Sequence, residues 1–332
     1  MPPDRSRHGE LSRRALLLGG GALAGLPTLV PASGMAQERQ ALRLGLALEA
    51  TGWLPIYVAA THTAADEGLQ IDLAAFNGDA GAAQALASDS VQVAVVSLSG
   101  LLQMIAAGLP VKGFYAGLNQ AAWEWFGQAD LRGWADVRGK TVAIASFAGL
   151  TDVLTRHVLR KHGLEPGRDV QLVQIGGSAT RLESLRARRV AVTMLTAPFK
   201  WQAAAAGLVR LGTQATEVAR DWPTGVFCAK ESFLAGSPGL LRALVRAHVR
   251  AIRLARADSE VGIATLSRRL RYERGDAERA YREAIAAADE RGLLPQESMA
   301  VFWSVMRDAG EVTAPWPESR FLDRRFIDAL GP

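Results

Sequence analysis

Few residues of the sequence have the types and spacing that catalysis requires. The one cysteine, Cys228, excludes both a disulfide and a cysteine-based zinc site within the chain, and its apolar surroundings indicate a small buried residue. His157 and His162 are five residues apart, the wrong spacing for one face of a helix, and neither an H-E-x-x-H nor a G-x-S-x-G pattern occurs. Without a nucleophile–base set, the sequence argues against an enzyme, and it indicates no cofactor and no metal site.

Hydroxyl side chains are better placed for binding, because they recur where a predicted strand gives way to a helix. These residues are Ser97, Ser99, Ser146, Thr151, Ser178 and Thr196. The first amides of a helix are unpaired and the helix dipole is positive there, so such junctions favour an anionic group, to which a hydroxyl can also donate. Gly149 and Gly177 let a ligand approach the backbone closely. Helix capping explains any one of these hydroxyls alone, but their recurrence in both halves of the chain favours a ligand site.

Aromatic residues supply the second feature of a ligand site. Trp53 and Tyr57 follow the first predicted strand. Phe147 follows a later strand, and Trp222 lies where the chain would cross between two halves. Asn119 could add a polar contact, although a turn role explains it equally well. Because aromatic walls with few polar groups are usual in small-molecule pockets, we expect a small organic anion, a sulfonate or carboxylate with an apolar or aromatic body. A neutral heterocycle such as a pyrimidine is the second ligand class.

These side chains need a scaffold that aligns strand ends, and the alternation of strands and helices predicts one. Short β-like runs occupy residues 42–47, 70–76, 91–96 and 111–116, and then 141–145, 170–175 and 190–195, with helical stretches between them. Such alternation predicts an α/β fold of mixed, mostly parallel sheets flanked by helices. Because the pattern restarts after residue 140, we expect two lobes, with the ligand beyond the carboxyl ends of the strands.

The last third of the sequence is helical. Pro238 is a favourable first residue for a helix whose apolar stripe includes Leu241 and Leu244. His248 falls on the same stripe, so we expect a core histidine with its hydrogen bonds satisfied.

Length and charge limit the function further. The 332 residues are 49% hydrophobic and 21% charged, which suits a globular protein of two lobes. The formal net charge of +5 is mild, and no block of Lys and Arg is interleaved with aromatic residues. Nucleic-acid binding is therefore not expected.

Residues 1–36 have the three parts of an export signal. Arg13 and Arg14 precede an apolar, glycine-rich stretch that runs to Val30, and Gly34-Met35-Ala36 is a small-residue cleavage site. Paired arginines in this place are typical of a twin-arginine signal. No cysteine follows the apolar stretch, so a lipid anchor at a lipobox is excluded. We expect a soluble, monomeric periplasmic protein that begins near Gln37, with an uncleaved N-terminal anchor as the alternative.

Four segments carry a resemblance to a known family, over roughly residues 42–260. They are Trp53-Leu54-Pro55, Val96-Ser97-Leu98-Ser99, Asp136-Val137-Arg138-Gly139-Lys140-Thr141-Val142-Ala143, and the stretch from Ser184-Leu185-Arg186-Ala187 to Pro198. In these the chain resembles the ABC-transporter solute-binding proteins of the nitrate/sulfonate/taurine type, which are grouped with pyrimidine-precursor binders (the SsuA/THI5-like, NMT1 group). The family often has an acidic residue in the strand before Pro198, whereas this strand reads Val190-Ala191-Val192-Thr193-Met194.

The resemblance implies a type II periplasmic binding protein that closes by hinge motion on its ligand and delivers it to a membrane permease. Lobe one would comprise residues 41–135 and 222–332, and lobe two residues 136–221. A sensor that signals through a membrane protein is an alternative to transport. Pyrimidine-forming enzymes in the wider group carry a cysteine-rich motif, and a single Cys228 gives that chemistry no support.

Overall fold

The computed structural model describes residues 39–120 and 122–328. The predicted export signal, residues 1–36, lies outside the described residues. Within those two ranges, no helix combines the length and the apolar character that crossing a membrane requires.

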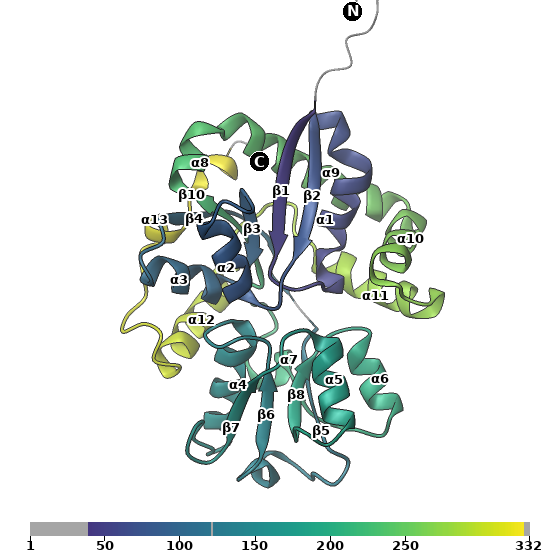
Figure 1. Cartoon of the computed structure of the whole chain (residues 1–332), viewed down its shortest axis with the longest axis vertical. Helices are drawn as coiled ribbons and strands as arrows, with labels where there is room; N and C mark the ends of the chain where they lie inside the picture. The colour runs from purple at the N-terminus through teal and green to yellow at the C-terminus, as the bar shows by residue number, and fades with distance from the viewer. Residues whose placement is uncertain (1–38, 121, 329–332) are drawn as a thin grey trace, which may run out of the picture. The chain divides into compact units, whose positions relative to one another are not determined.

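The first sheet has the strand order β2-β1-β3-β10-β4 (Figure 1). Its strands are β1 (Gln40–Leu46), β2 (Leu69–Ala75), β3 (Val93–Val96), β4 (Val111–Leu118) and β10 (Gly225–Lys230). Strand β1 is parallel to β2 and β3, whereas β10 is antiparallel to both of its neighbours. Every residue of β3 is buried, as expected of a strand that is covered on both faces.

The second sheet repeats this plan with the order β7-β6-β8-β5-β9. Its strands are β5 (Glu124–Gly127), β6 (Thr141–Ile144), β7 (Gln171–Gln174), β8 (Val192–Leu195) and β9 (Val209–Thr213). Strand β6 is parallel to β7 and β8, and β5 is antiparallel to β8 and β9. Two mixed sheets with flanking helices confirm the predicted two-lobed α/β fold. Below, lobe one means the first sheet with its helices, and lobe two means the second sheet with its helices.

Helices flank both sheets (Figure 1). In lobe one, α1 (Leu54–Val58), α2 (Asp79–Ala87) and α3 (Leu98–Ala106) connect the early strands. In lobe two, α4 (Leu150–Lys161), α5 (Ser178–Arg186), α6 (Phe199–Ala205) and α7 (Gln214–Glu217) follow the strands. After β10 come α8 (Glu231–Gly236), α9 (Pro238–Ala257), α10 (Ser259–Leu270), α11 (Arg274–Ala287), α12 (Gln296–Asp308) and α13 (Glu318–Phe321). The predicted stripe of α9 is confirmed, because Leu241 and Leu244 are buried while Arg246 and Arg250 are exposed.

The chain crosses between the sheets twice. It leaves the first sheet after Leu118 and enters the second at Glu124, and it returns between Thr213 and Gly225. Strand β5 therefore belongs to the second sheet, although the range expected for lobe one ran to residue 135. An antiparallel strand inserted directly after a crossing has no helix before it, so the alternation of strands and helices does not reveal it.

Candidate functional site

Two adjoining cavities lie where the strand ends of both lobes meet. The first has a volume of about 40 Å³ and the second about 50 Å³, each enough for a few water molecules. They share the lining residues Ala50, Trp53, Trp123 and Thr224. The first is also lined by Ala47, Leu48, Gly78, Asp79, Ser97, Ala145, Ser146, Leu150 and Thr151. Since Ser97 follows β3 and Ala145 follows β6, this is the ligand position that the α/β architecture predicts.

Four of the predicted hydroxyls reach these cavities. Ser97, Ser146 and Thr151 line the first, and Thr196 lines the second. Two of the hydroxyls also support helix starts: the Ser97 Oγ accepts from the Gly100 amide at 2.9 Å, and the Thr151 Oγ1 accepts from the Ala145 amide at 2.8 Å. Helix capping and cavity lining are therefore both served by Ser97.

The other predicted residues at helix starts lie outside both linings. Ser99 is fully buried, with its Oγ 2.8 Å from the Ser97 Oγ. Gly177 and Ser178 stand at the start of α5, where the Ser178 Oγ accepts from the guanidinium of Arg181 at 3.1 Å. Gly149 directly precedes α4 and is not among the residues that line the first cavity.

Of the four predicted aromatic walls, only Trp53 lines the cavities. Trp53 is buried and donates from Nε1 to the Leu48 carbonyl at 2.6 Å. Tyr57 is instead a core residue, whose hydroxyl donates to the Ala50 carbonyl at 3.2 Å. Trp222 is also a core residue, with its ring 5.1 Å from that of Phe302.

Phe147 does not line either cavity, because it lies at the surface, whereas Tyr57 and Trp222 lie in the core. Its side chain is 48% exposed on the turn between β6 and α4. The second aromatic wall is Trp123, which is not among the four aromatic residues expected from the sequence. Trp123 lies in the first crossing segment, and that position was the one signal that could have identified it.

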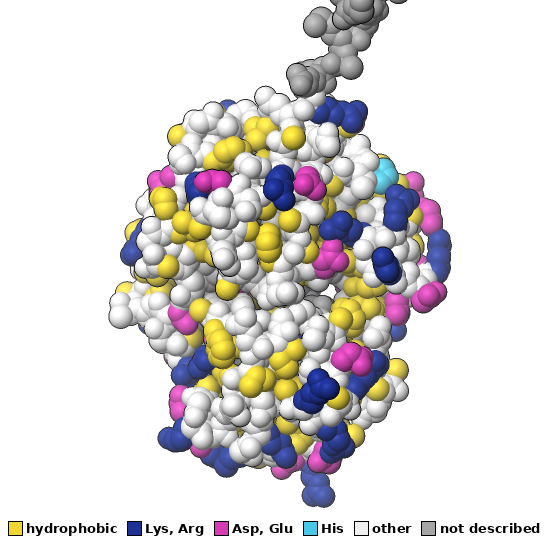
Figure 2. All heavy atoms as spheres, in the orientation of Figure 1, with side chains coloured by type: hydrophobic (Ala, Val, Ile, Leu, Met, Phe, Trp, Pro, Cys, Tyr) yellow, Lys and Arg dark blue, Asp and Glu magenta, His cyan; other side chains and the backbone are white. Residues whose placement is uncertain are grey.

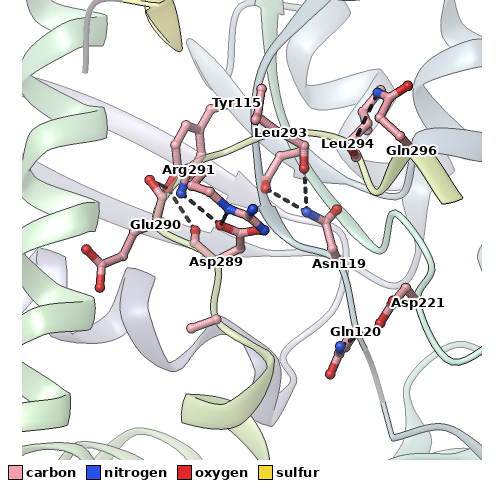
Figure 3. Close-up of polar contacts among 12 residues, drawn as sticks. Tyr115, Asn119, Gln120, Asp221, Asp289, Glu290, Arg291, Leu293, Leu294 and Gln296 are labelled. Atoms are coloured by element: carbon pink, nitrogen blue, oxygen red, sulfur yellow. Dashed lines mark hydrogen bonds and ion pairs between the residues drawn. The ribbon is translucent and has the colours of Figure 1, made fainter. Parts of the chain in front are cut away.

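Asn119 also lies at the first crossing, but it faces a different cavity of about 680 Å³. Its Nδ2 donates to the Leu293 carbonyl at 2.6 Å (Figure 3). The buried Tyr115 hydroxyl also contacts the segment after α11, at the Asp289 and Glu290 carbonyls, 3.0 Å from each (Figure 3). Asn119 therefore fixes the segment that follows α11 and does not line either cavity between the lobes.

Asp79 is the residue of the cleft that sequence reasoning missed. It is the first residue of α2, it is 8% exposed, and it lines the first cavity. Its Oδ1 accepts from the Ser97 amide at 3.0 Å, and its Oδ2 accepts from the Ser97 Oγ at 2.8 Å and from the Leu150 amide at 3.2 Å. Leu150 is the first residue of α4 in lobe two, so this carboxylate joins the two lobes. The expectation of unpaired amides at the starts of α3 and α4 is wrong at these two amides, because a side chain of the protein takes them.

Further contacts hold the lobes together around the cavities. The Thr51 Oγ1 donates to the Ala197 carbonyl at 3.1 Å, and the Tyr272 hydroxyl donates to the same carbonyl at 3.2 Å. The buried Lys200 ammonium of α6 lies 2.9 Å from a carboxylate oxygen of Glu283 on α11. The structure is therefore a closed arrangement of the two lobes.

Charged side chains of both signs are interspersed over the surface in Figure 2, but few reach the cavities. Among the described residues that line them, only Asp79 and Glu283 are charged, and both are acidic. The Glu283 carboxylate is already paired with Lys200. The lining is thus aromatic, hydroxylic and acidic, and the part of the chain that the structure describes adds no Lys or Arg to it.

Lobe two also contains a buried cation that lines neither cavity. Arg181 is completely buried, and burial lowers its pKa to about 9. It donates to the carbonyls of Gly176 and Met194 and to the hydroxyls of Ser178 and Thr193. Thr193 lies in the strand before Pro198, where the family that the sequence resembles often has an acidic residue. All four acceptors of the Arg181 guanidinium are therefore neutral.

Comparison with known proteins identifies the family. The sequence matches the model of the NMT1-like family over residues 35–265, so the chain belongs to the NMT1-like family. No curated protein matches it.

Solved structures share the fold. A protein from Bordetella bronchiseptica RB50 is 20% identical, with a TM-score of 0.74 over 88% of this chain and 97% of that one. The alkanesulfonate-binding protein SsuA from Xanthomonas axonopodis pv. citri, bound to MOPS, is 18% identical, with a TM-score of 0.70 over 86% of this chain and 99% of that one. The periplasmic nitrate-binding protein NrtA from Synechocystis PCC 6803 is 17% identical, with a TM-score of 0.63 over 86% and 92%. The fold is that of type II periplasmic binding proteins.

Proposed function

We propose that this chain is the solute-binding component of an ABC uptake system, which captures a small organic solute between its lobes in the periplasm and delivers it to a membrane permease. One observation carries the proposal: the cleft is lined from both lobes, at the carboxyl ends of their strands. The family membership and the fold support it, as do structural neighbours that bind alkanesulfonate or nitrate.

Closure of the lobes is the step that would trap the solute. The two crossing segments, 119–123 and 214–224, are the only backbone links between the sheets among the described residues, and they serve as the hinge. Contacts such as Thr51 to Ala197 exist only when the lobes are together. A solute that touches both lobes adds to these contacts and so shifts the population toward the closed form, which the permease would recognise.

The walls indicate what kind of solute fits. Trp53 and Trp123 offer flat apolar surfaces, and Ser97, Ser146 and Thr151 offer directed polar contacts. A flat organic body with one or two polar groups matches this lining better than an inorganic ion such as nitrate does. The sulfonates or carboxylates and the pyrimidines expected from the sequence both have such bodies.

A thermal-shift screen of the purified protein against sulfonates, carboxylates and pyrimidines tests the proposal. A solute that binds only the folded state raises the melting temperature. At a concentration one hundred times its Kd it adds about 2.7 kcal/mol to the free energy of unfolding. Mass spectrometry should recover that solute unchanged, whereas a pyrimidine-forming enzyme would alter it.

Trp53→Phe should weaken binding of that solute at least tenfold, because it removes part of one wall and the hydrogen bond to the Leu48 carbonyl that orients the ring. Trp316→Phe is the matched control, since Trp316 lies outside both linings. Equal loss of affinity in the two variants, or chemical conversion of the solute, would contradict the proposal.

A further inference from the structure

The carboxylate of Asp79 occupies the place that a ligand anion would be expected to take. It accepts from the Ser97 amide just before α3 and from the Leu150 amide that begins α4. Both amides lie at the positive end of a helix dipole, where a negative group is most stable. The two helices belong to different lobes, so one tethered anion satisfies both.

Two glycines make room for the Asp79 carboxylate. A Cβ at Gly100 would stand 2.6 Å from the Asp79 Cγ. A Cβ at Gly149 would stand 2.9 Å from the Asp79 Oδ2 and 2.7 Å from the Ser146 Oγ. Glycine on each side, one in each lobe, is therefore required for the Asp79 side chain to reach α4 in the closed form.

The charge of Asp79 has no cationic partner in the cleft. Neither lining contains a Lys or Arg among the described residues, and the nearby Lys200 is paired with Glu283 and Glu124. A second anion placed in the first cavity would face this carboxylate without a compensating positive side chain, in a site where little water screens the repulsion. A carboxylate has about four acceptor positions, and the protein fills three of those on Asp79.

We infer that Asp79 is a built-in substitute for an anionic ligand group and that it determines specificity by excluding anionic solutes from this cleft. The solute is then neutral or cationic, has a flat body for the two tryptophans, and donates an N–H or O–H to the remaining acceptor position of Asp79. This rests on the proposed function, and it selects the nitrogen heterocycle over the sulfonate or carboxylate.

Removing the carboxylate should convert the cleft into an anion site. Asp79→Ala frees the amides of Ser97 and Leu150, so formate and methanesulfonate should raise the melting temperature of this variant saturably. The wild-type protein should need at least tenfold more of either anion for the same shift. Asp89→Ala is the matched control, because Asp89 is an exposed acid of lobe one whose partner is Lys230, and it should respond as the wild type does. If Asp79→Ala does not fold, Asp79→Ser replaces it, since a hydroxyl can still pair with Ser97.

A second comparison uses one body with three charges. Benzamide or benzamidine should shift the melting temperature of the wild-type protein, and benzoate should not. The inference is overturned if the wild type binds benzoate or methanesulfonate more tightly than benzamide, or if the folded Asp79 variants show no anion response. Tight binding of an anion to the wild type would contradict the role of Asp79 but would still support the solute-binding function. If no organic solute binds the wild type while Asp79→Ala responds clearly to formate, the solute-binding function is contradicted and the role of Asp79 is supported.

Discussion

His248 lies in the core of lobe one, against two aromatic rings. It is 3% exposed on α9, with its ring 5.4 Å from that of Tyr115 and 5.1 Å from that of Phe227. Neither ring nitrogen has a hydrogen-bond partner among the described residues, so the expected core position is confirmed but the expected satisfaction is wrong. Burial lowers the pKa of His248 to about 3, from an ordinary value of 6.5.

Acid should therefore destabilise the protein before its carboxylates are protonated. Below pH 6.5 the unfolded chain binds a proton at His248 and the folded chain does not, so the free energy of unfolding falls as the pH falls toward 3. The loss approaches about 1.4 kcal/mol for each pH unit below pH 6.5, which amounts to about 2.3 kcal/mol between pH 6.5 and 4.5 and to about 5 kcal/mol in the limit. The total is comparable to the stability of a typical domain.

Urea unfolding followed by tryptophan fluorescence at pH 4.5, 5.5, 6.5 and 7.5 measures this slope. His248→Leu should lose most of it and be no less stable at pH 7.5, because the new side chain is apolar like its surroundings. Burial also lowers the pKa of His157, so a smaller slope of the same sign should survive. His62→Leu removes an exposed histidine and should leave the slope unchanged. If His248→Leu keeps the full wild-type slope, the reasoning about His248 is refuted.

Two further predictions concern other buried groups. Lys200→Met should cost about 2 kcal/mol of stability, because it leaves Glu124 and Glu283 without their shared cation, and adding Glu283→Gln should restore part of the loss in the same urea titrations. An unchanged urea midpoint in Lys200→Met would show that these ion pairs contribute nothing to the free energy of unfolding. Burial raises the pKa of the Cys228 thiol to about 12, so a thiol reagent should label the native protein at least a hundredfold more slowly than the urea-unfolded protein; equal rates would place Cys228 at the surface.

Local patterns predicted most of the fold. The strand at 141–145 and the helix from Pro238 follow from hydrophobic periodicity and capping preferences, and the structure has them at Thr141–Ile144 and Pro238–Ala257. The insertion of Glu124–Gly127 between β8 and β9 depends on pairing across the sheet, which no local pattern encodes.

Local patterns also predicted part of the candidate site, and the rest depends on tertiary packing. Ser97, Ser146 and Thr151 were identified because a strand-to-helix junction is visible in the sequence and strand ends converge in an α/β sheet. Whether an aromatic ring faces the cleft or the core depends on tertiary packing, which is why Tyr57 was misplaced. Asp79 could not be found from spacing, since its partner Leu150 is 71 residues away and in the other lobe.

The two inserted strands set the order in which the halves can be finished. Strand β10 separates β3 from β4, so β4 has no neighbour in its own sheet until residues 225–230 have been made. By then every strand of the second sheet has already been synthesised. The half that starts first along the polypeptide is thus completed last, and a nascent chain that ends between Thr213 and Gly225 contains every strand of the second sheet but lacks β10 of the first.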